Sequence, residues 1–153
     1  DWKAPTGFGI LCPRKEKTST LGILYTSSIF PQRAPPGKVL LRSILGGATN
    51  PEFCDQDPQE IQRIALENLK AILGDCPAPL KQTVVIYKRG IPQYTIGHSE
   101  RVAQIRAALK PFPSLHLAGN FLGGVAVKDC VRVAHEVALQ IRQGDPSSWE
   151  NRA

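Results

Sequence analysis

The stretch that most constrains the fold is residues 115–141, LHLAGNFLGGVAVKDCVRVAHEVALQI. In it a short apolar run, a glycine-rich turn and a long amphipathic segment follow one another without a break. Residues 114–118 alternate apolar and polar side chains, which predicts a short buried strand. Gly119, Gly123 and Gly124 allow a tight turn, because no Cβ obstructs the backbone there. We therefore expect a strand-turn-helix unit whose helix starts near Gly124.

The helix of this unit is predicted to be amphipathic, with one apolar face. Its apolar side chains recur at steps of four and three residues, which places them in one stripe along a helix. Gly144 is a suitable residue to end the helix, and residues 144–153 are expected to form a flexible tail. The stripe consists of Val127, Val131, Ala134, Ala138 and Ile141.

A glycine-rich turn that leads into a helix can bind an anionic or electron-rich ligand. The first N–H groups of a helix lack partners within it and carry partial positive charge. The alternative is a close-packed corner between a strand and a helix, which needs glycine for packing alone. Neither this turn nor Gly7-Phe8-Gly9 forms the GxGxxG fingerprint of a dinucleotide site.

Three stretches resemble one known family. LAGNFLGGVAVKDC resembles the C-terminal flavin-contacting motif of the flavin-dependent amine oxidase superfamily, and its GVAVKDC portion is most similar to the protoporphyrinogen oxidase family. GFGILCPRKE, followed by TLGILYTSSIFPQRAPPGKVLL, is similar in residue identity and spacing to the plastid-type members. GIPQYTIGH is similar to the IPQ-aromatic-xxGH element of the family. The resemblance covers residues 5–141 and corresponds to the C-terminal part of these enzymes.

The resemblance implies part of an FAD-dependent oxidase. Such an enzyme converts protoporphyrinogen IX to protoporphyrin IX in haem and chlorophyll synthesis, with oxygen as the acceptor. The absence of any Met leads us to expect a piece of a longer chain. The GxGxxG turn of the family is not among these residues, so the chain alone is expected to hold no FAD and to be inactive. Its first partner would then be the missing N-terminal part of the same enzyme.

The resemblance also implies which residues meet the ligands. Phe30 would offer an aromatic face to the flat tetrapyrrole, although the residues alone equally allow a core side chain at a strand end. The backbone of the glycine turn would face the flavin, where a helix N-terminus stabilises negative charge on the reduced ring. Substrate contacts are assigned to Gly9, Ile10 and Phe30, and flavin contacts to Gly119, Asn120, Gly124, Val125, Ala126 and Val127.

Other candidates for chemistry are interpreted as structural, and no catalytic residue is assigned. Tyr94 and His98 are residue types that can transfer protons. We interpret GHSE instead as a helix start, in which Ser99 caps a helix over residues 102–109. The three histidines have no partner at metal-ligand spacing, so no metal site is predicted. Free thiols are expected at the four cysteines, which form no CxxC pair: Cys12, Cys54, Cys76 and Cys130.

The rest of the chain predicts an antiparallel meander followed by a helix. Turn residues separate three apolar, β-rich runs. Asp57 or Asp55 is suited to cap the next helix, which Gly74 ends, and the β-branched run at residues 84–87 predicts a further strand. The meander strands are residues 7–12, 21–27 and 38–45, and the helix has an apolar stripe made of Ile61, Ile64, Ala65, Leu69 and Ile72.

These elements predict the α+β class. Residues 5–110 would be part of a substrate-binding domain, an antiparallel sheet with packed helices. Residues 111–143 would be a strand-helix unit of an FAD-binding domain, Rossmann-like and of the GR2 type. Because the parallel neighbours of that strand are not in the sequence, we expect it to pair in a homodimer or in a rearranged C-terminus.

Composition limits the partners and the location. The net charge of +6 is compatible with nucleic acid, a membrane surface or an acidic ligand, but the Lys and Arg residues are scattered. We predict a tetrapyrrole ligand, no nucleic acid, and at most peripheral contact with the inner face of a membrane. The expected location is cytoplasmic, or the plastid in a eukaryote.

Two other functions stay open at this point. The chain could belong to another superfamily member, an amine oxidase or a carotenoid desaturase, or it could be a non-catalytic module that binds a tetrapyrrole or a lipid. The residues also do not decide between protoporphyrinogen and coproporphyrinogen as the substrate.

Overall fold

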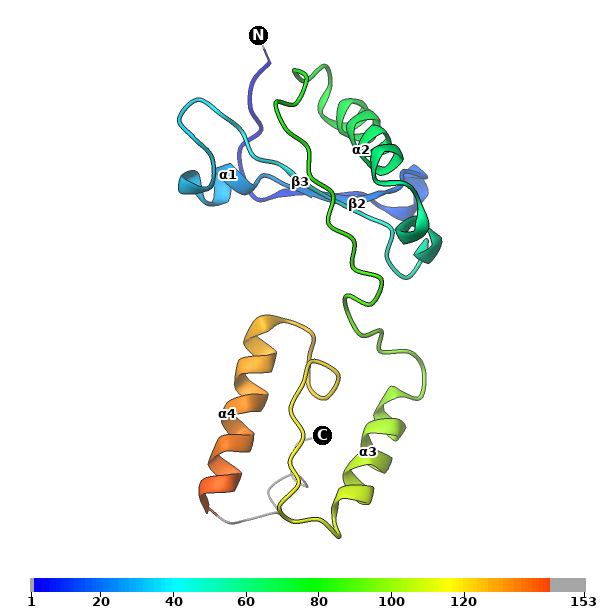
Figure 1. Cartoon of the computed structure of the whole chain (residues 1–153), viewed down its shortest axis with the longest axis vertical. Helices are drawn as coiled ribbons and strands as arrows, with labels where there is room; N and C mark the ends of the chain where they lie inside the picture. Colours follow the sequence, from blue (N-terminus) through cyan, green and yellow to red (C-terminus); the bar gives the residue numbers. More distant parts are fainter. Residues whose placement is uncertain (1, 144–153) are drawn as a thin grey trace. The chain divides into compact units, whose positions relative to one another are not determined.

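The computed structural model describes residues 2–143 and contains two compact units. The first unit ends at Lys88 and the second begins at Arg89 (Figure 1). An antiparallel sheet lies in the first unit, and helices occur in both. The α+β class is therefore confirmed.

The first unit is built on a three-stranded antiparallel sheet in the order β1-β2-β3 (Figure 1). Leu24 pairs with Gly9 on one side and with Arg42 on the other, so β2 is the central strand. The predicted meander is confirmed, with strands shorter than the apolar runs. The strands are β1 (Gly9–Leu11), β2 (Thr20–Leu24) and β3 (Arg42–Leu45).

A short helix replaces the end of the second predicted strand. The run predicted as a strand to residue 27 instead turns into the short helix α1 (Thr26–Ile29). Its end is fixed where the Phe30 N–H donates to the Thr26 carbonyl at 2.9 Å. Three further turns are 3-10 helices, η1 (Arg14–Glu16), η2 (Pro31–Arg33) and η3 (Pro51–Asp55).

Helix α2 (Pro58–Leu73) packs against β2 and β3. The Asp57 Oδ1 atom accepts the Gln59 N–H at 2.8 Å, which confirms Asp57 as the cap. Gly74 follows the helix with a φ of 78°, a left-handed value that favours glycine. The predicted apolar stripe of α2 is buried or half-buried, with Ile61 only 6 % exposed.

The core of the first unit surrounds Ile23, which is fully buried in the central strand. Thr20 is also buried, and its Oγ1 accepts a hydrogen bond from Asn68 Nδ2 of α2 at 3.1 Å. This bond satisfies a polar group that would otherwise be costly to bury. The other buried apolar side chains of this unit are Tyr25, Phe53 and Ile61.

The second unit contains helices α3 (His98–Leu109) and α4 (Val127–Gln143). An irregular segment, residues 110–126, runs between them (Figure 1). Val102 of α3 and Val133 of α4 are buried, at 7 % and 3 % exposure. These two residues mark the small core of this unit.

Two predicted strands are wrong. Residues 84–87 and residues 114–118 form no strand in the described part of the chain. A strand needs a neighbouring backbone to complete its ladder, and β-rich side chains alone do not supply one. Neither segment is assigned a β-ladder with another strand in the described residues.

The ends of the two late helices also differ from prediction. Helix α3 begins at His98 with Gly97 at the cap position, so Ser99 lies inside the helix and the predicted Ser99 cap is wrong. Helix α4 begins at Val127, three residues beyond Gly124. The expected stop at Gly144 and the tail at 144–153 lie outside the described residues.

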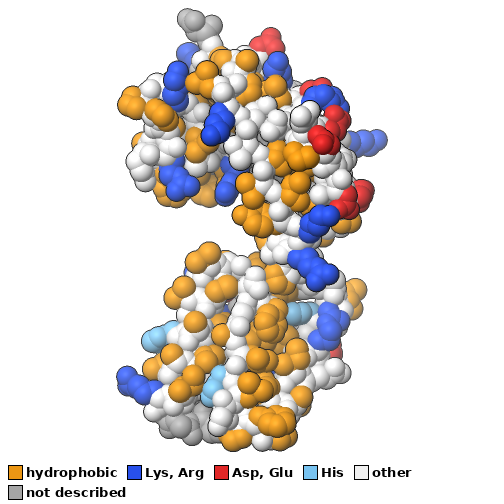
Figure 2. All heavy atoms as spheres, in the orientation of Figure 1, with side chains coloured by type: hydrophobic (Ala, Val, Ile, Leu, Met, Phe, Trp, Pro, Cys, Tyr) orange, Lys and Arg blue, Asp and Glu red, His pale blue; other side chains and the backbone are white. Residues whose placement is uncertain are grey.

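The apolar stripe of α4 lies on one face of the helix, as predicted, and this face is exposed. Val127 is 81 % exposed, Val131 64 % and Ile141 59 %, whereas Val133 faces the interior of the unit. Ala134 and Ala138, the other stripe residues, are exposed as well. Figure 2 shows many hydrophobic side chains on the visible face of this unit. The periodicity predicted the helix correctly, but the stripe has no partner in the described residues.

Candidate functional site

The glycine loop, residues 119–126, connects the irregular segment to α4. Gly124 has a φ of 127°, and a Cβ at this position would overlap the Asp129 carboxylate. A Cβ at Gly119 would approach the Phe121 ring to 2.6 Å. The packing of the loop therefore requires glycine at position 124, whatever the loop binds, whereas a side chain at position 119 would require the Phe121 ring to shift.

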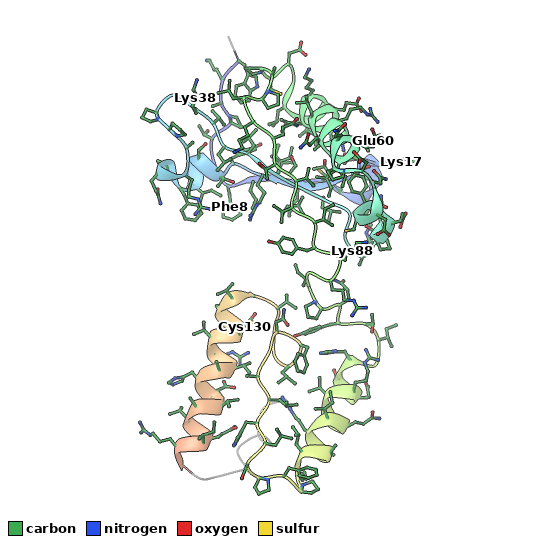
Figure 3. All side chains as sticks on the ribbon, viewed as in Figure 1. Phe8, Lys17, Lys38, Glu60, Lys88 and Cys130 are labelled. Atoms are coloured by element: carbon green, nitrogen blue, oxygen red, sulfur yellow. The ribbon has the colours of Figure 1, made fainter. Side chains whose placement is uncertain are left out.

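The start of α4 is capped by the side chain of Asp129, a residue in its own first turn. The Ala126 carbonyl accepts the N–H groups of Asp129 and Cys130 at 2.9 and 3.1 Å. In return the Ala126 N–H donates to Asp129 Oδ2 at 3.3 Å, in the manner of the second half of a capping box. Figure 3 shows Cys130 in this first turn. The Ala126 N–H is thus already bonded within the chain.

Several N–H groups at this end stay available. Within residues 2–143, the backbone N–H groups of Val125, Val127 and Lys128 have no hydrogen-bond partner. Val125 and Val127 are exposed, at 43 % and 81 %. They can donate to an electron-rich ligand, and the helix N-terminus adds partial positive charge. The Asp129 carboxylate beside them offsets part of that charge.

Arg132 attaches the loop to the second turn of α4. Its Nη2 donates to the Gly123 carbonyl at 2.7 Å, and its Nη1 lies 3.2 Å from the Glu136 carboxylate. The loop is therefore held to α4 from both the first and the second turn. Sequence reasoning placed Arg132 away from the apolar stripe and assigned it no contact.

Tyr94 makes a contact that sequence reasoning missed. Its hydroxyl donates to the Asn120 carbonyl at 2.7 Å and accepts the Gly124 N–H at 2.9 Å. Its ring stacks on His98, with the centroids 4.0 Å apart. Asn120 also borders an open hollow of about 390 Å³ whose other lining residues are Arg89, Gly90, Ile91 and Pro92.

The residues assigned to the substrate lie in the first unit. Gly9 and Ile10 belong to the edge strand β1, and a Cβ at Gly9 would overlap the Ile23 carbonyl of β2. Close pairing of the two strands thus explains this glycine. Phe30 follows α1 and is 51 % exposed, so it is not a core residue. An open hollow of about 550 Å³ in this unit is lined by residues 4–6, 27–28, 31–32 and 34–39, without these three.

Other chemistry is sparse in the described chain. Among residues 2–143, no cluster of three or more His, Cys, Asp or Glu side chains could hold a metal ion. No helix in that range is both long and apolar enough to cross a membrane. The four cysteines are free thiols, as predicted. Burial raises the pKa of the Cys12 thiol, and the charge of Glu16 raises it further.

A family model for flavin containing amine oxidoreductases matches residues 2–142. The chain belongs to this family. It is 38 % identical over 139 residues to the chloroplastic protoporphyrinogen oxidase of Nicotiana tabacum, covering 88 % of this chain and 25 % of that protein. It is 34 % identical over 149 residues to protoporphyrinogen oxidase of Homo sapiens, covering 93 % and 31 %. The resemblance inferred from the motifs is confirmed.

A third relative is named for a different substrate. Coproporphyrinogen III oxidase of Bacillus subtilis is 30 % identical over 126 residues, covering 82 % of this chain and 27 % of that protein. The chain spans about a quarter to a third of the length of these relatives.

A solved structure has the same fold over most of the chain. It is the crystal structure of a candidate protoporphyrinogen oxidase from Exiguobacterium sp. 255-15, with a TM-score of 0.78 and 26 % identity. The match covers 92 % of this chain and 31 % of that one. The two units together therefore correspond to part of a larger protein of this family.

Proposed function

We propose that this chain is the C-terminal part of an FAD-dependent oxidase that converts protoporphyrinogen IX to protoporphyrin IX in haem or chlorophyll synthesis. The observation that carries the proposal is the similarity to protoporphyrinogen oxidases over 88 to 93 % of the chain. FAD, when bound, supplies the redox chemistry, with oxygen as the final acceptor. The residues of this chain supply positioning and electrostatics.

Two features of the glycine loop support a contact with the edge of a flavin ring. Val125 and Val127 offer two N–H donors with no partner among the described residues, next to a helix N-terminus. The Ala126 N–H is bonded to Asp129, so it would meet a ligand only after that bond opens. We assign the flavin contacts to Gly119, Asn120, Gly124, Val125, Ala126 and Val127, with the two valines as donors.

The exposed stripe of α4 supports an assignment to the flavin domain. Side chains as apolar as Val131 and Ile141 are seldom left so exposed in a contiguous helical stripe unless another surface covers it. We assign residues 111–143 to the FAD-binding domain, and the N-terminal part of the same enzyme is the partner that covers the stripe.

The first unit supplies the substrate side. We assign residues 5–110 to the substrate-binding domain, with contacts to the tetrapyrrole from Gly9, Ile10 and Phe30. The half-exposed ring of Phe30 supports this role, since an aromatic face in the open can stack on a flat ligand. The location we propose is the cytoplasm or, in a eukaryote, the plastid, with peripheral membrane contact.

A chimera tests the proposal directly. The 139-residue segment of the tobacco chloroplastic enzyme that this chain matches would be replaced by the chain itself. The purified chimera is expected to carry FAD absorbance and to oxidise protoporphyrinogen IX to a fluorescent porphyrin. The isolated chain, as a control, is expected to be colourless and inactive, because the pyrophosphate and adenosine contacts of FAD lie elsewhere in the family.

Two results would contradict the proposal. One is a folded chimera that carries FAD and oxidises an amine but no porphyrinogen, and the other is stoichiometric flavin on the isolated chain. The Bacillus subtilis relative makes coproporphyrinogen III the second candidate substrate. Assay of both porphyrinogens with the same preparation decides between them.

A further inference from the structure

The Tyr94 hydroxyl joins the two ends of a five-residue loop. It donates to the Asn120 carbonyl at 2.7 Å and accepts the Gly124 N–H at 2.9 Å. Both distances are ordinary for such hydrogen bonds. One side chain thus fixes the separation between residues 120 and 124, in a loop where Gly123 and Gly124 allow many backbone conformations.

The ring of Tyr94 is itself fixed by the start of α3. His98, the first residue of that helix, stacks on it at an interplanar angle of 15°. Within the same short segment, Arg101 of α3 donates to Thr95 Oγ1 at 2.7 Å. The His98 N–H donates to the Thr95 carbonyl at 3.0 Å. A continuous set of contacts therefore runs from α3 through Tyr94 to the loop before α4.

The same hydroxyl decides which backbone donors the loop presents. The Gly124 N–H is bonded to Tyr94, and the Ala126 N–H is bonded to Asp129. The N–H groups of Val125 and Val127, which have no partner among the described residues, alternate with these two. Without Tyr94, the Gly124 N–H would also be free, and the loop would lose the bond that sets its shape.

We infer that Tyr94 is a positioning residue for flavin binding, which orients the Val125 and Val127 donors by holding the loop closed. The inference rests on the proposed function, since it takes the ligand of the loop to be the flavin. Tyr94 makes no contact of its own with the flavin. It acts through Asn120 and Gly124.

The substitution Tyr94→Phe tests the inference, because it keeps the ring that stacks on His98 and removes only the hydroxyl. Tyr87→Phe is the matched control. It also removes one tyrosine hydroxyl, but from an exposed side chain of the first unit. In the isolated chain, amide hydrogen exchange of Gly124, followed by NMR, is expected to become about 2- to 12-fold faster in Tyr94→Phe, the factor for one neutral hydrogen bond. Exchange in α3 is expected to stay unchanged, as is exchange at Gly124 in the Tyr87→Phe control.

The second measurement uses the tobacco chimera. There Tyr94→Phe is expected to raise the dissociation constant of FAD by a similar factor, because the loop must then be ordered on binding. Unchanged exchange at Gly124 would overturn the inference. Faster exchange at Gly124 together with an unchanged dissociation constant of FAD would also overturn the inference. The proposed function would still hold in that case if the parent chimera carries FAD and oxidises the porphyrinogen. A parent chimera with no FAD would overturn both.

Discussion

Two valines on one helix give the sharpest test of how α4 is oriented. Val133 is 3 % exposed and Val131 is 64 % exposed, and both are interior positions of α4. The same change, Val→Ala, removes the same two methyl groups from each. The change in intrinsic helix propensity, about 0.5 kcal/mol in favour of Ala, is also the same at the two positions.

The free energies of unfolding are therefore expected to differ mainly through burial. Val133→Ala loses about 1.5 to 2.5 kcal/mol of transfer and cavity free energy, which the propensity gain reduces to about 1 to 2 kcal/mol. Val131→Ala loses little burial, so the isolated chain is expected to be unchanged or more stable by up to about 0.5 kcal/mol. The propensity contribution cancels in the difference, which is about 1.5 to 2.5 kcal/mol.

Native-state hydrogen exchange of the α4 amides is the suitable assay, because it reports the stability of this helix rather than that of the first unit. Equal destabilisation by the two changes would refute the orientation of α4 described above. The same pair in the tobacco chimera tests what covers the stripe. There Val131→Ala is expected to cost about 1 kcal/mol or more, since the N-terminal part of the enzyme would bury this side chain.

Three further changes test other parts of the chain. Phe30→Ala is expected to leave the stability of the isolated chain within about 0.5 kcal/mol, and to weaken substrate binding in the chimera by about 1 to 2 kcal/mol, measured as KM. A loss of stability with an unchanged KM would make Phe30 a core residue. Asp57→Ala removes the α2 cap and is expected to cost about 1 kcal/mol in urea unfolding. The pKa of Cys12 is raised, so its alkylation rate should reach half its maximum at a higher pH in the folded chain than in urea, and Glu16→Gln should lower that pH.

The contrast between α2 and α4 shows what the sequence can predict. Both helices were predicted from the same apolar periodicity, and both exist. For α2 the buried face was also predicted correctly, because β2 and β3 lie within the same unit and cover it. For α4 the stripe is real but uncovered here. Periodicity reports which side chains need a partner and cannot report whether this chain supplies it.

The two wrong strands have a related cause. Residues 84–87 and 114–118 have β-rich or alternating side chains, and strands were predicted from these local preferences alone. A strand also requires a partner backbone, which is a property of the tertiary structure. In the meander the partners are close in sequence, with Leu11 opposite Gly22, only eleven residues later, so those strands were predictable.

The contacts that shape the candidate site were beyond sequence reasoning for a different reason. Tyr94 lies 26 and 30 residues from the loop atoms that it bonds, and no periodicity joins residues so far apart. The motif around Tyr94 suggested that the segment matters. It did not suggest that the hydroxyl bonds the glycine loop.

The start of α4 combines two requirements that oppose each other. A stable helix start needs its free N–H groups bonded, and Asp129 does this for Ala126. A site for an electron-rich ring needs free N–H groups and positive charge, and the Asp129 carboxylate removes one donor and offsets part of that charge. Different residues meet the two requirements. The Ala126 N–H is bonded to the capping side chain of Asp129, and the N–H groups of Val125 and Val127 remain as donors. The helix can thus be stable before any ligand arrives while the loop still binds through the two valines.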